Sequence, residues 1–116
     1  MDAILSAVRN SMRGLGAAFR SERAVRQEIL ILALSVPAAL LISSDLWVRV
    51  ALVGTVLLTL AVELLNTAVE KLCDHVTPER HPRIGTVKDI GSAAVFCALA
   101  LSALVWGAAL HQAIGL

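Results

Sequence analysis

Three long apolar runs are the main feature of the chain. They cover residues 29–45, 46–72 and 89–115. An α-helix needs about 20 apolar residues to cross the hydrocarbon core of a bilayer, so each run is a candidate span. Hydrophobic residues make up 58% of the 116 residues, which exceeds the roughly half found in soluble domains. The pattern predicts one all-α integral membrane domain, residues 1–116, with three transmembrane helices.

The stretch 1–26, before the first span, has a helical periodicity of a different kind. At about 100° per residue, six apolar side chains fall on one side of such a helix and three arginines fall opposite them. The apolar side is formed by Ile4, Leu5, Val8, Met12, Leu15 and Phe19, and the opposite side by Arg9, Arg13 and Arg20. This distribution is typical of a helix lying in the membrane interface. We therefore expect an N-terminal amphipathic surface helix over residues 1–26.

Lysine and arginine are distributed unevenly around the spans. Five of the ten precede the first span and four surround the connection 74–88, whereas only Arg49 is near the first connection. By the positive-inside rule, the N-terminus and a 74–88 loop face the cytoplasm and the C-terminus lies outside. The net charge of +1 leaves no basic excess to neutralise phosphates, which argues against a general nucleic-acid-binding protein.

The second span carries a stripe of polar residues in its second half. Glu63, Asn66, Glu70 and Asp74 fall within about 80° of one another on a helix and therefore share one face. A carboxylate at this depth costs several kcal/mol unless it is paired, protonated or bound to a cation. One interpretation is structural, in which Glu63 is protonated or hydrogen-bonded between helices. The other is a cation site that acts on a group at the membrane surface.

Further charged residues lie on the same predicted side of the membrane. Glu22 and Glu28 precede the first span, and Lys88 and Asp89 begin the third. Carboxylates that hold Mg²⁺, together with a lysine that reaches phosphate oxygens, are the groups that phosphoryl transfer uses. A deeper carboxylate could then deprotonate a hydroxyl. Helix ends, arginine pairing and membrane anchoring are the structural alternatives for these four residues, and Gly85 and Gly91 would allow close backbone approach.

The segment ELLNTAVEKLCD, residues 63–74, closely resembles the signature of the prokaryotic diacylglycerol kinase family, which also includes undecaprenol kinases. The resemblance continues through FRSERAVRQE, Asp45, Arg49, KDIGSAAV and Trp106. It implies an integral lipid kinase of the bacterial cytoplasmic membrane that transfers the γ-phosphate of ATP, with Mg²⁺, to a lipid hydroxyl. It also implies a homotrimer whose active sites form between subunits.

The resemblance assigns roles position by position. Glu63 corresponds to the catalytic base, Asn66 to a residue that orients groups beside it, and Glu22 and Glu70 to the Mg²⁺ ligands. The ATP-binding positions are Asn10, Glu22, Glu70, Glu79, His81, Lys88 and Asp89. The positions lining the lipid substrate are Glu28, Arg49, Glu63, Ser92 and Trp106. The surface helix departs from the family pattern, because Ala3 and Asn10 replace an arginine and a tyrosine, and Arg9 or Arg13 could supply the missing contacts.

Two classes of function compete on these observations. The first is a lipid kinase, with diacylglycerol as the preferred acceptor and undecaprenol as the alternative. The second is a non-enzymatic membrane protein, a small proton-coupled exporter or a pore. An exporter of this type would have four spans, and a pore would have no use for the Glu22 and Glu70 pair. The kinase is therefore the favoured prediction.

Overall fold

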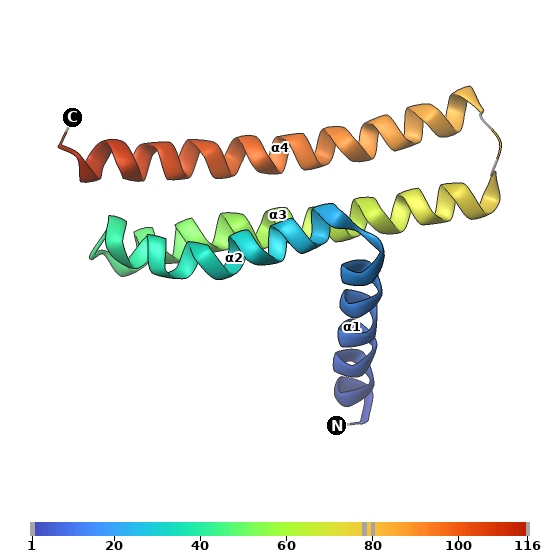
Figure 1. Ribbon diagram of the computed structural model, residues 1–116, viewed down its shortest axis with the longest axis horizontal. Coiled ribbons are helices and arrows are strands. Elements are labelled where there is room, and N and C mark those ends of the chain that lie inside the picture. The colour runs from blue at the N-terminus through green and yellow to red at the C-terminus, as the bar shows by residue number, and fades with distance from the viewer. Residues whose placement is uncertain (1, 78, 80, 116) are drawn as a thin grey trace.

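Four α-helices form the computed structural model, which describes residues 2–77, 79 and 81–115. They are α1 (Asp2–Ser21), α2 (Arg23–Ile42), α3 (Leu46–Val76) and α4 (Pro82–Ala113) (Figure 1). Helices α2, α3 and α4 run alongside one another, and each is long and apolar enough to cross a membrane. Helix α1 turns away from them and contacts α2 and α3. The prediction of an all-α integral membrane fold with a surface helix and three spans is confirmed.

The surface helix is shorter than the expected 1–26, because the chain breaks at Glu22. This residue has an extended backbone, with φ −122° and ψ 118°. Arg26, on the first turn of α2, donates from Nη1 to the carbonyls of Phe19 (2.8 Å) and Arg20 (3.3 Å). These carbonyls belong to the last turn of α1, where no intrahelical donor remains. Arg26 therefore stabilises the change of direction between the two helices.

The connection between α2 and α3 is short and hydrogen-bonded at both sides. Asp45 caps α3 by accepting from the backbone N–H of Trp47 at 2.9 Å. Arg49 donates to the carbonyls of Ser43 (2.6 Å) and Leu40 (3.3 Å) at the end of α2. Both contacts satisfy backbone groups that a helix end leaves unpaired.

Helices α3 and α4 extend well into the stretch 74–88 that was expected to be a loop. Helix α3 continues to Val76, and α4 begins at Pro82, where proline suits the first helical position. His81 caps α4 by accepting from the N–H of Arg83 at 3.1 Å. The loop prediction is therefore too long, because polarity at 74–88 reflects exposed helix faces rather than loss of helix. The boundaries of the membrane itself stay a prediction.

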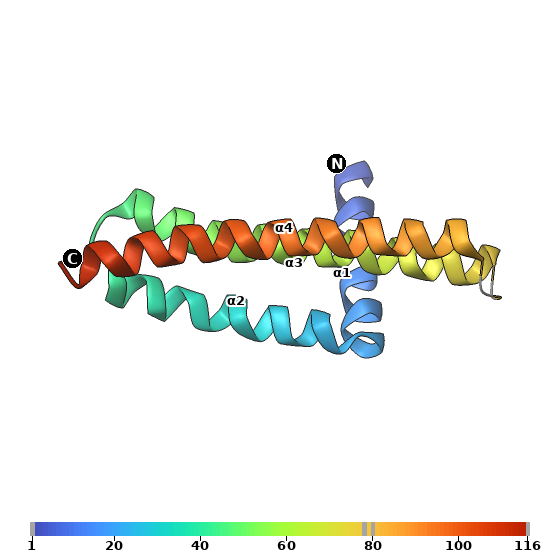
Figure 2. The ribbon, with the colours of Figure 1, turned by 90° about the horizontal axis from the view of Figure 1, so that it is seen from above.

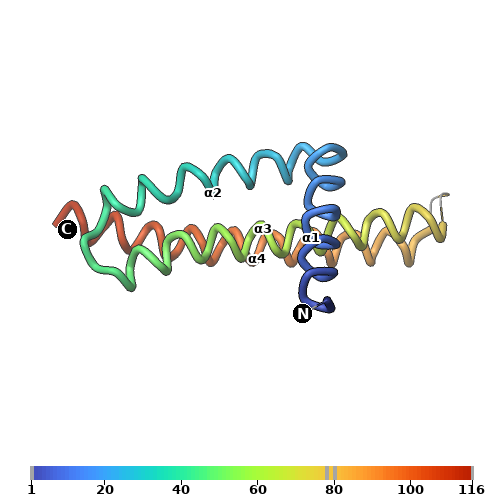
Figure 3. The backbone as a smooth tube through the Cα atoms, turned by 90° about the horizontal axis from the view of Figure 1, so that it is seen from below, coloured from blue at the N-terminus to red at the C-terminus, as the bar shows by residue number. Residues whose placement is uncertain are grey.

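The two longest helices exceed the thickness of a bilayer core. Their 31 and 32 residues correspond to about 46 and 48 Å, against about 30 Å of hydrocarbon. Their joined ends extend beyond the level of α1 (Figure 1). Figure 3 shows α1 beneath the bundle, directed from the start of α2 across the line of α3. Helix α1 thus marks a level between the apolar bundle and the projecting ends.

Buried side chains form two clusters at different levels of the bundle. One contains Ala18, Val25 and Leu60, where α1, α2 and α3 meet. The other, near the 43–45 connection, contains Ala39, Leu52 and Ala109, and we call this region the packed end. Helix α4 lies along α3, whereas α2 lies to one side of this pair (Figure 2).

Candidate active site

Four carboxylates come together near the level of α1, and we call this region the acidic end. Glu63 and Glu70 lie half-buried on α3, while Glu22 joins α1 to α2 and Glu28 lies on the second turn of α2. Glu22, Glu28 and Glu70 are all within electrostatic range of Glu63. These residues come from α2, from α3 and from the junction between α1 and α2, and their roles in a common site stay predictions.

Asn66 is the most buried member of the stripe, with 8% of its surface exposed. Its Nδ2 donates to Oε1 of Glu70 at 3.3 Å. The side-chain Oδ1 is buried without a hydrogen-bond partner among the described residues. The amide N–H of Asn66 thus faces the carboxylate of Glu70. The opposite orientation would place two acceptor oxygens against each other.

Gly91 explains how α4 approaches this amide so closely. A Cβ at position 91 would overlap Oδ1 of Asn66, so the amide or the helix would have to shift. The expected close approach is thus found at Gly91. At Gly85 an added Cβ would meet nothing within 4 Å, so packing within one chain does not require glycine there.

Two lysines pair with carboxylates of the stripe and its surroundings. Lys71 lies 3.5 Å from Oε1 of Glu22, linking α3 to the α1–α2 junction. Lys88 on α4 donates from Nζ to Oδ1 of Asp74 on α3 at 2.5 Å. Lys88 belongs to the stretch 74–88 predicted to face the cytoplasm, and this hydrogen bond raises the pKa of its ammonium group.

Beyond α1, the ends of α3 and α4 line an open cavity of about 280 Å³. It is lined by Asp74, Thr77, Glu79, His81, Ile84, Gly85 and Lys88. Three predicted ATP-binding residues, Glu79, His81 and Lys88, therefore share one cavity. Asp89 is exposed on α4, and Asn10 is exposed on α1, and neither lines this cavity.

The predicted lipid-lining residues do not form one cluster. Glu28 and Glu63 are at the acidic end, and Ser92 is exposed on α4. Arg49 is 14 residues before Glu63 on the same helix, or about 21 Å away along the axis, and it bonds the end of α2. Trp106 is equally far from Ser92 along α4, and its indole N–H donates to the carbonyl of Leu52 at 3.0 Å.

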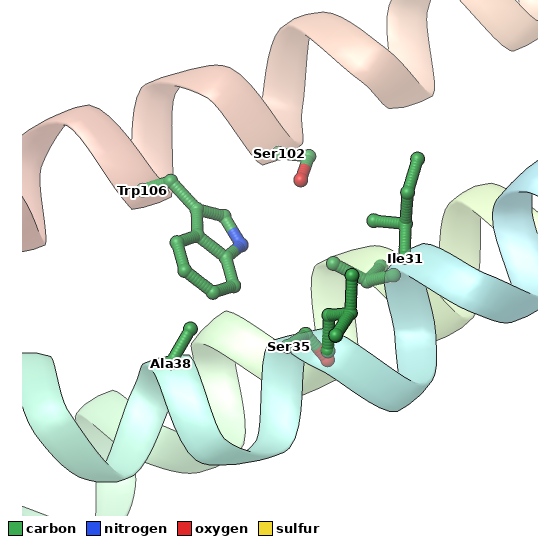
Figure 4. A pocket seen from close by; sticks show the side chains of 7 residues that line it. Ile31, Ser35, Ala38, Ser102 and Trp106 are labelled. Atoms are coloured by element: carbon green, nitrogen blue, oxygen red, sulfur yellow. The ribbon is translucent and has the colours of Figure 1, made fainter.

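Trp106 faces a second, apolar cavity of about 380 Å³ at the middle of the bundle. Trp106 and Ser102 point from α4 towards Ile31, Ser35 and Ala38 of α2 (Figure 4). Ser102 also donates to Oγ1 of Thr55 on α3 at 3.3 Å. This cavity is separated along the helices from the carboxylates and offers few polar groups.

The acidic end contains carboxylates, the ligand type that magnesium prefers. No group of three or more His, Cys, Asp and Glu side chains in residues 2–77, 79 and 81–115 is arranged to hold a metal alone. Mg²⁺ commonly uses only one or two protein carboxylates and takes its other ligands from phosphates and water. Glu22 and Glu70 supply two carboxylates of this kind.

Sequence reasoning missed two contributors to this region. Lys71 was counted only for topology, yet it pairs with Glu22. Thr59 donates to the carbonyls of Thr55 (2.8 Å) and Ala98 (3.5 Å), which ties α3 to α4 below the site. The position of Lys71 directly after Glu70 could have indicated its pairing with a nearby carboxylate such as Glu22. Nothing in the sequence indicated the second.

The fold and this region together define a helical membrane protein with an acidic region beside its amphipathic N-terminal helix. Residues 9–110 match the family described as prokaryotic diacylglycerol kinase. The chain is 43% identical over 103 residues to the diacylglycerol kinase of Pseudomonas aeruginosa, covering 89% of this chain and 84% of the relative. It is 39% identical over 103 residues to that of Escherichia coli K12, with the same coverage. It is 36% identical over 104 residues to that of Haemophilus influenzae, covering 90% and 88%.

The chain therefore belongs to the prokaryotic diacylglycerol kinase family, and it is a lipid kinase of the bacterial membrane. Membership of a kinase family removes the exporter and the pore from consideration.

Proposed function

We propose that the protein phosphorylates diacylglycerol to phosphatidic acid at the cytoplasmic surface of the bacterial membrane, with MgATP as phosphate donor. The observation that carries this proposal is that Glu22, Glu28 and Glu70 all lie within electrostatic range of Glu63, near the level of the surface helix. A lipid headgroup and a soluble nucleotide can meet only at such a level. The curated relatives reported above are diacylglycerol kinases, which supports this acceptor.

Glu63 is the general base in this proposal. Its carboxylate takes the proton of the lipid hydroxyl while the hydroxyl oxygen attacks the γ-phosphorus of ATP. The bond between the γ-phosphorus and the oxygen bridging to the β-phosphate breaks, and ADP leaves. Glu63 is the deepest carboxylate of the stripe, so it is the one closest to the bilayer. A positioned base of this kind contributes about 10²- to 10⁴-fold to the rate.

Glu22 and Glu70 are the proposed ligands of Mg²⁺. When bound, the ion neutralises charge on the β- and γ-phosphates. Asn66 donates to Glu70 and thereby fixes one ligand. Lys71 forms an ion pair with Glu22. This pair would have to break before Glu22 could bind the ion.

The nucleotide is proposed to occupy the projecting ends of α3 and α4. Lys88 supplies a cation for the phosphates, and Asp89, Glu79 and His81 surround it. Asn10 on α1 takes the place of a tyrosine at the position for the base and ribose. The cavity lined by Glu79, His81 and Lys88 supports this placement.

The lipid is proposed to lie with its hydroxyl at Glu63 and Glu28 and with Ser92 beside it. Arg49 and Trp106 then lie at the level of the distal acyl chains rather than of the headgroup. About 21 Å along a helix, the separation of Arg49 from Glu63, is of the order of an extended acyl chain. Undecaprenol would place its hydroxyl at the same carboxylates.

The active unit is proposed to be a homotrimer with the N-terminus in the cytoplasm and the C-terminus outside. Glu63 and Glu70 are only half-buried in one chain, although they lie on a helix that is long and apolar enough to cross a bilayer. Burial of these groups by neighbouring copies would lower the cost of keeping them at this depth.

The direct test is phosphate transfer by the purified protein. The full chain, in lipid–detergent micelles, is incubated with radiolabelled ATP, Mg²⁺ and either diacylglycerol or undecaprenol. We expect labelled phosphatidic acid to exceed labelled undecaprenyl phosphate by about tenfold or more, as a site built around one acceptor discriminates. Preferential labelling of undecaprenol would overturn the assignment of the acceptor. Absence of labelling with both lipids would overturn the activity.

A further inference from the structure

The contact between Gly91 and Asn66 has a consequence for the reaction itself. Asn66 is nine-tenths buried, and its Oδ1 has no hydrogen-bond partner among the described residues. Such an atom normally loses free energy on burial. The backbone of α4 at Gly91 nevertheless covers it, in a space that any Cβ would occupy. The amide is therefore held in an orientation that costs free energy, because its Oδ1 is buried without a hydrogen bond.

This orientation points the other end of the amide at a proposed metal ligand. Nδ2 of Asn66 donates to Oε1 of Glu70 at 3.3 Å, one helical turn further along α3. If the amide rotated, its carbonyl oxygen would face the carboxylate and the two acceptors would repel each other. Glycine at position 91 leaves open the space that Oδ1 occupies, because a Cβ there would overlap this atom.

We infer that Gly91 is a positioning residue for catalysis, which acts through Asn66 to hold the Glu70 carboxylate in place for Mg²⁺. The inference rests on the proposed kinase function. Gly91 touches no reactant itself. It supplies a flat surface on α4, and a methyl group at that position would displace the amide and release Glu70. Residues that orient metal ligands in this way commonly change metal affinity or activity by about 10- to 100-fold.

The chain provides a matched control in the same helix. A Cβ at Gly107 would meet nothing within 4 Å, so Gly107→Ala has the same helix-favouring effect as Gly91→Ala without a clash. Both variants are made in the full chain, and diacylglycerol phosphorylation is measured while Mg²⁺ is titrated at fixed ATP. We expect Gly91→Ala to lower kcat about tenfold or more and to raise the Mg²⁺ concentration for half-maximal activity about threefold or more. The KM for diacylglycerol should stay within about twofold of the parent value, because the displaced groups, Asn66 and Glu70, are proposed to serve the metal rather than the lipid.

A double mutant separates positioning from simple packing. In Asn66→Ala the amide is absent, so Gly91→Ala has nothing left to displace. The double mutant should therefore have the activity of Asn66→Ala within about twofold, instead of a second tenfold loss. The comparison also holds if Gly91→Ala alone fails to fold, since the double mutant contains no clash.

Two results would overturn the inference while leaving the kinase function intact. One is a Gly91→Ala protein as active as Gly107→Ala with unchanged Mg²⁺ dependence. The other is a double mutant that loses a further factor of about ten relative to Asn66→Ala, which would mean that Gly91 acts independently of the amide. A parent protein that phosphorylates no lipid would overturn both the function and the inference.

Discussion

At the packed end, Leu52 and Ala39 are almost completely buried, and the nearby indole of Trp106 is hydrogen-bonded to a backbone carbonyl. At the acidic end, Glu63 and Glu70 are only half-buried, and the buried Oδ1 of Asn66 has no partner among the described residues. Both ends belong to the same helices, α2 to α4. Buried apolar side chains pack at both levels, but the buried side-chain atom without a partner among the described residues belongs to the acidic end, where it costs stability. Such groups are expected where a site must bind a ligand.

The largest expected effect is on turnover at the acidic end. Glu63→Gln keeps the shape of the side chain but removes the base, so kcat should fall about 10³-fold. Activity above about a tenth of the parent value would contradict the assignment of the base. Asp45→Asn is the control, because it also removes one carboxylate but does so at the packed end. It should keep activity within about twofold because asparagine caps a helix equally well.

The largest effect on stability should come from the packed end. Leu52 has no exposed surface, so Leu52→Ala leaves a cavity and should lower the free energy of unfolding by about 2–5 kcal/mol. Denaturation in detergent, followed by circular dichroism, measures this change. Leu41→Ala is the control, because Leu41 is 88% exposed. Equal losses in the two variants would mean that the buried cluster does not stabilise the bundle.

Glu70→Gln should change metal dependence rather than the chemical step. The neutral amide is a weaker ligand for Mg²⁺, so the Mg²⁺ concentration for half-maximal activity should rise about 10- to 100-fold. Titration of kinase activity against Mg²⁺ at saturating lipid measures the shift. A titration curve identical to that of the parent would remove Glu70 from the proposed ligands.

A smaller effect is expected from the indole hydrogen bond at the packed end. Trp106→Phe removes the donor to the carbonyl of Leu52 and keeps most of the apolar volume. The free energy of unfolding should fall by only about 0.6–1.7 kcal/mol, as for other interhelical hydrogen bonds in membranes. A measured loss much larger than this would show that Trp106 stabilises the fold mainly through its ring.

The smallest effect should come from the ion pair between Lys71 and Glu22. Lys71 is 54% exposed, so the pair is worth less than about 1 kcal/mol. Lys71→Met frees Glu22 and should lower the Mg²⁺ concentration for half-maximal activity by less than about fivefold. Lys71→Arg keeps the charge and should match the parent. An increased Mg²⁺ requirement in Lys71→Met would mean that Lys71 helps to bind the nucleotide.

The sequence was most informative where a property depends on local periodicity. The spacing of Glu63, Asn66 and Glu70 placed them on one face because a helix repeats every 3.6 residues, and Asn66 and Glu70 are hydrogen-bonded in the structure. The sequence was less informative at helix ends. The break at Glu22 and the helical turns within 74–88 depend on caps made by Arg26 and His81, which composition does not reveal.

The chain alone determined that three apolar helices cross a membrane and that one of them carries acidic groups, because hydropathy and helical periodicity are local properties. Tertiary structure decided which partner each charged or polar group has. Lys71 pairs with Glu22, Lys88 pairs with Asp74, and Gly91 rather than Gly85 meets a side chain closely. These contacts depend on the distance and rotation between packed helices, which are fixed only when all side chains at the interface fit together.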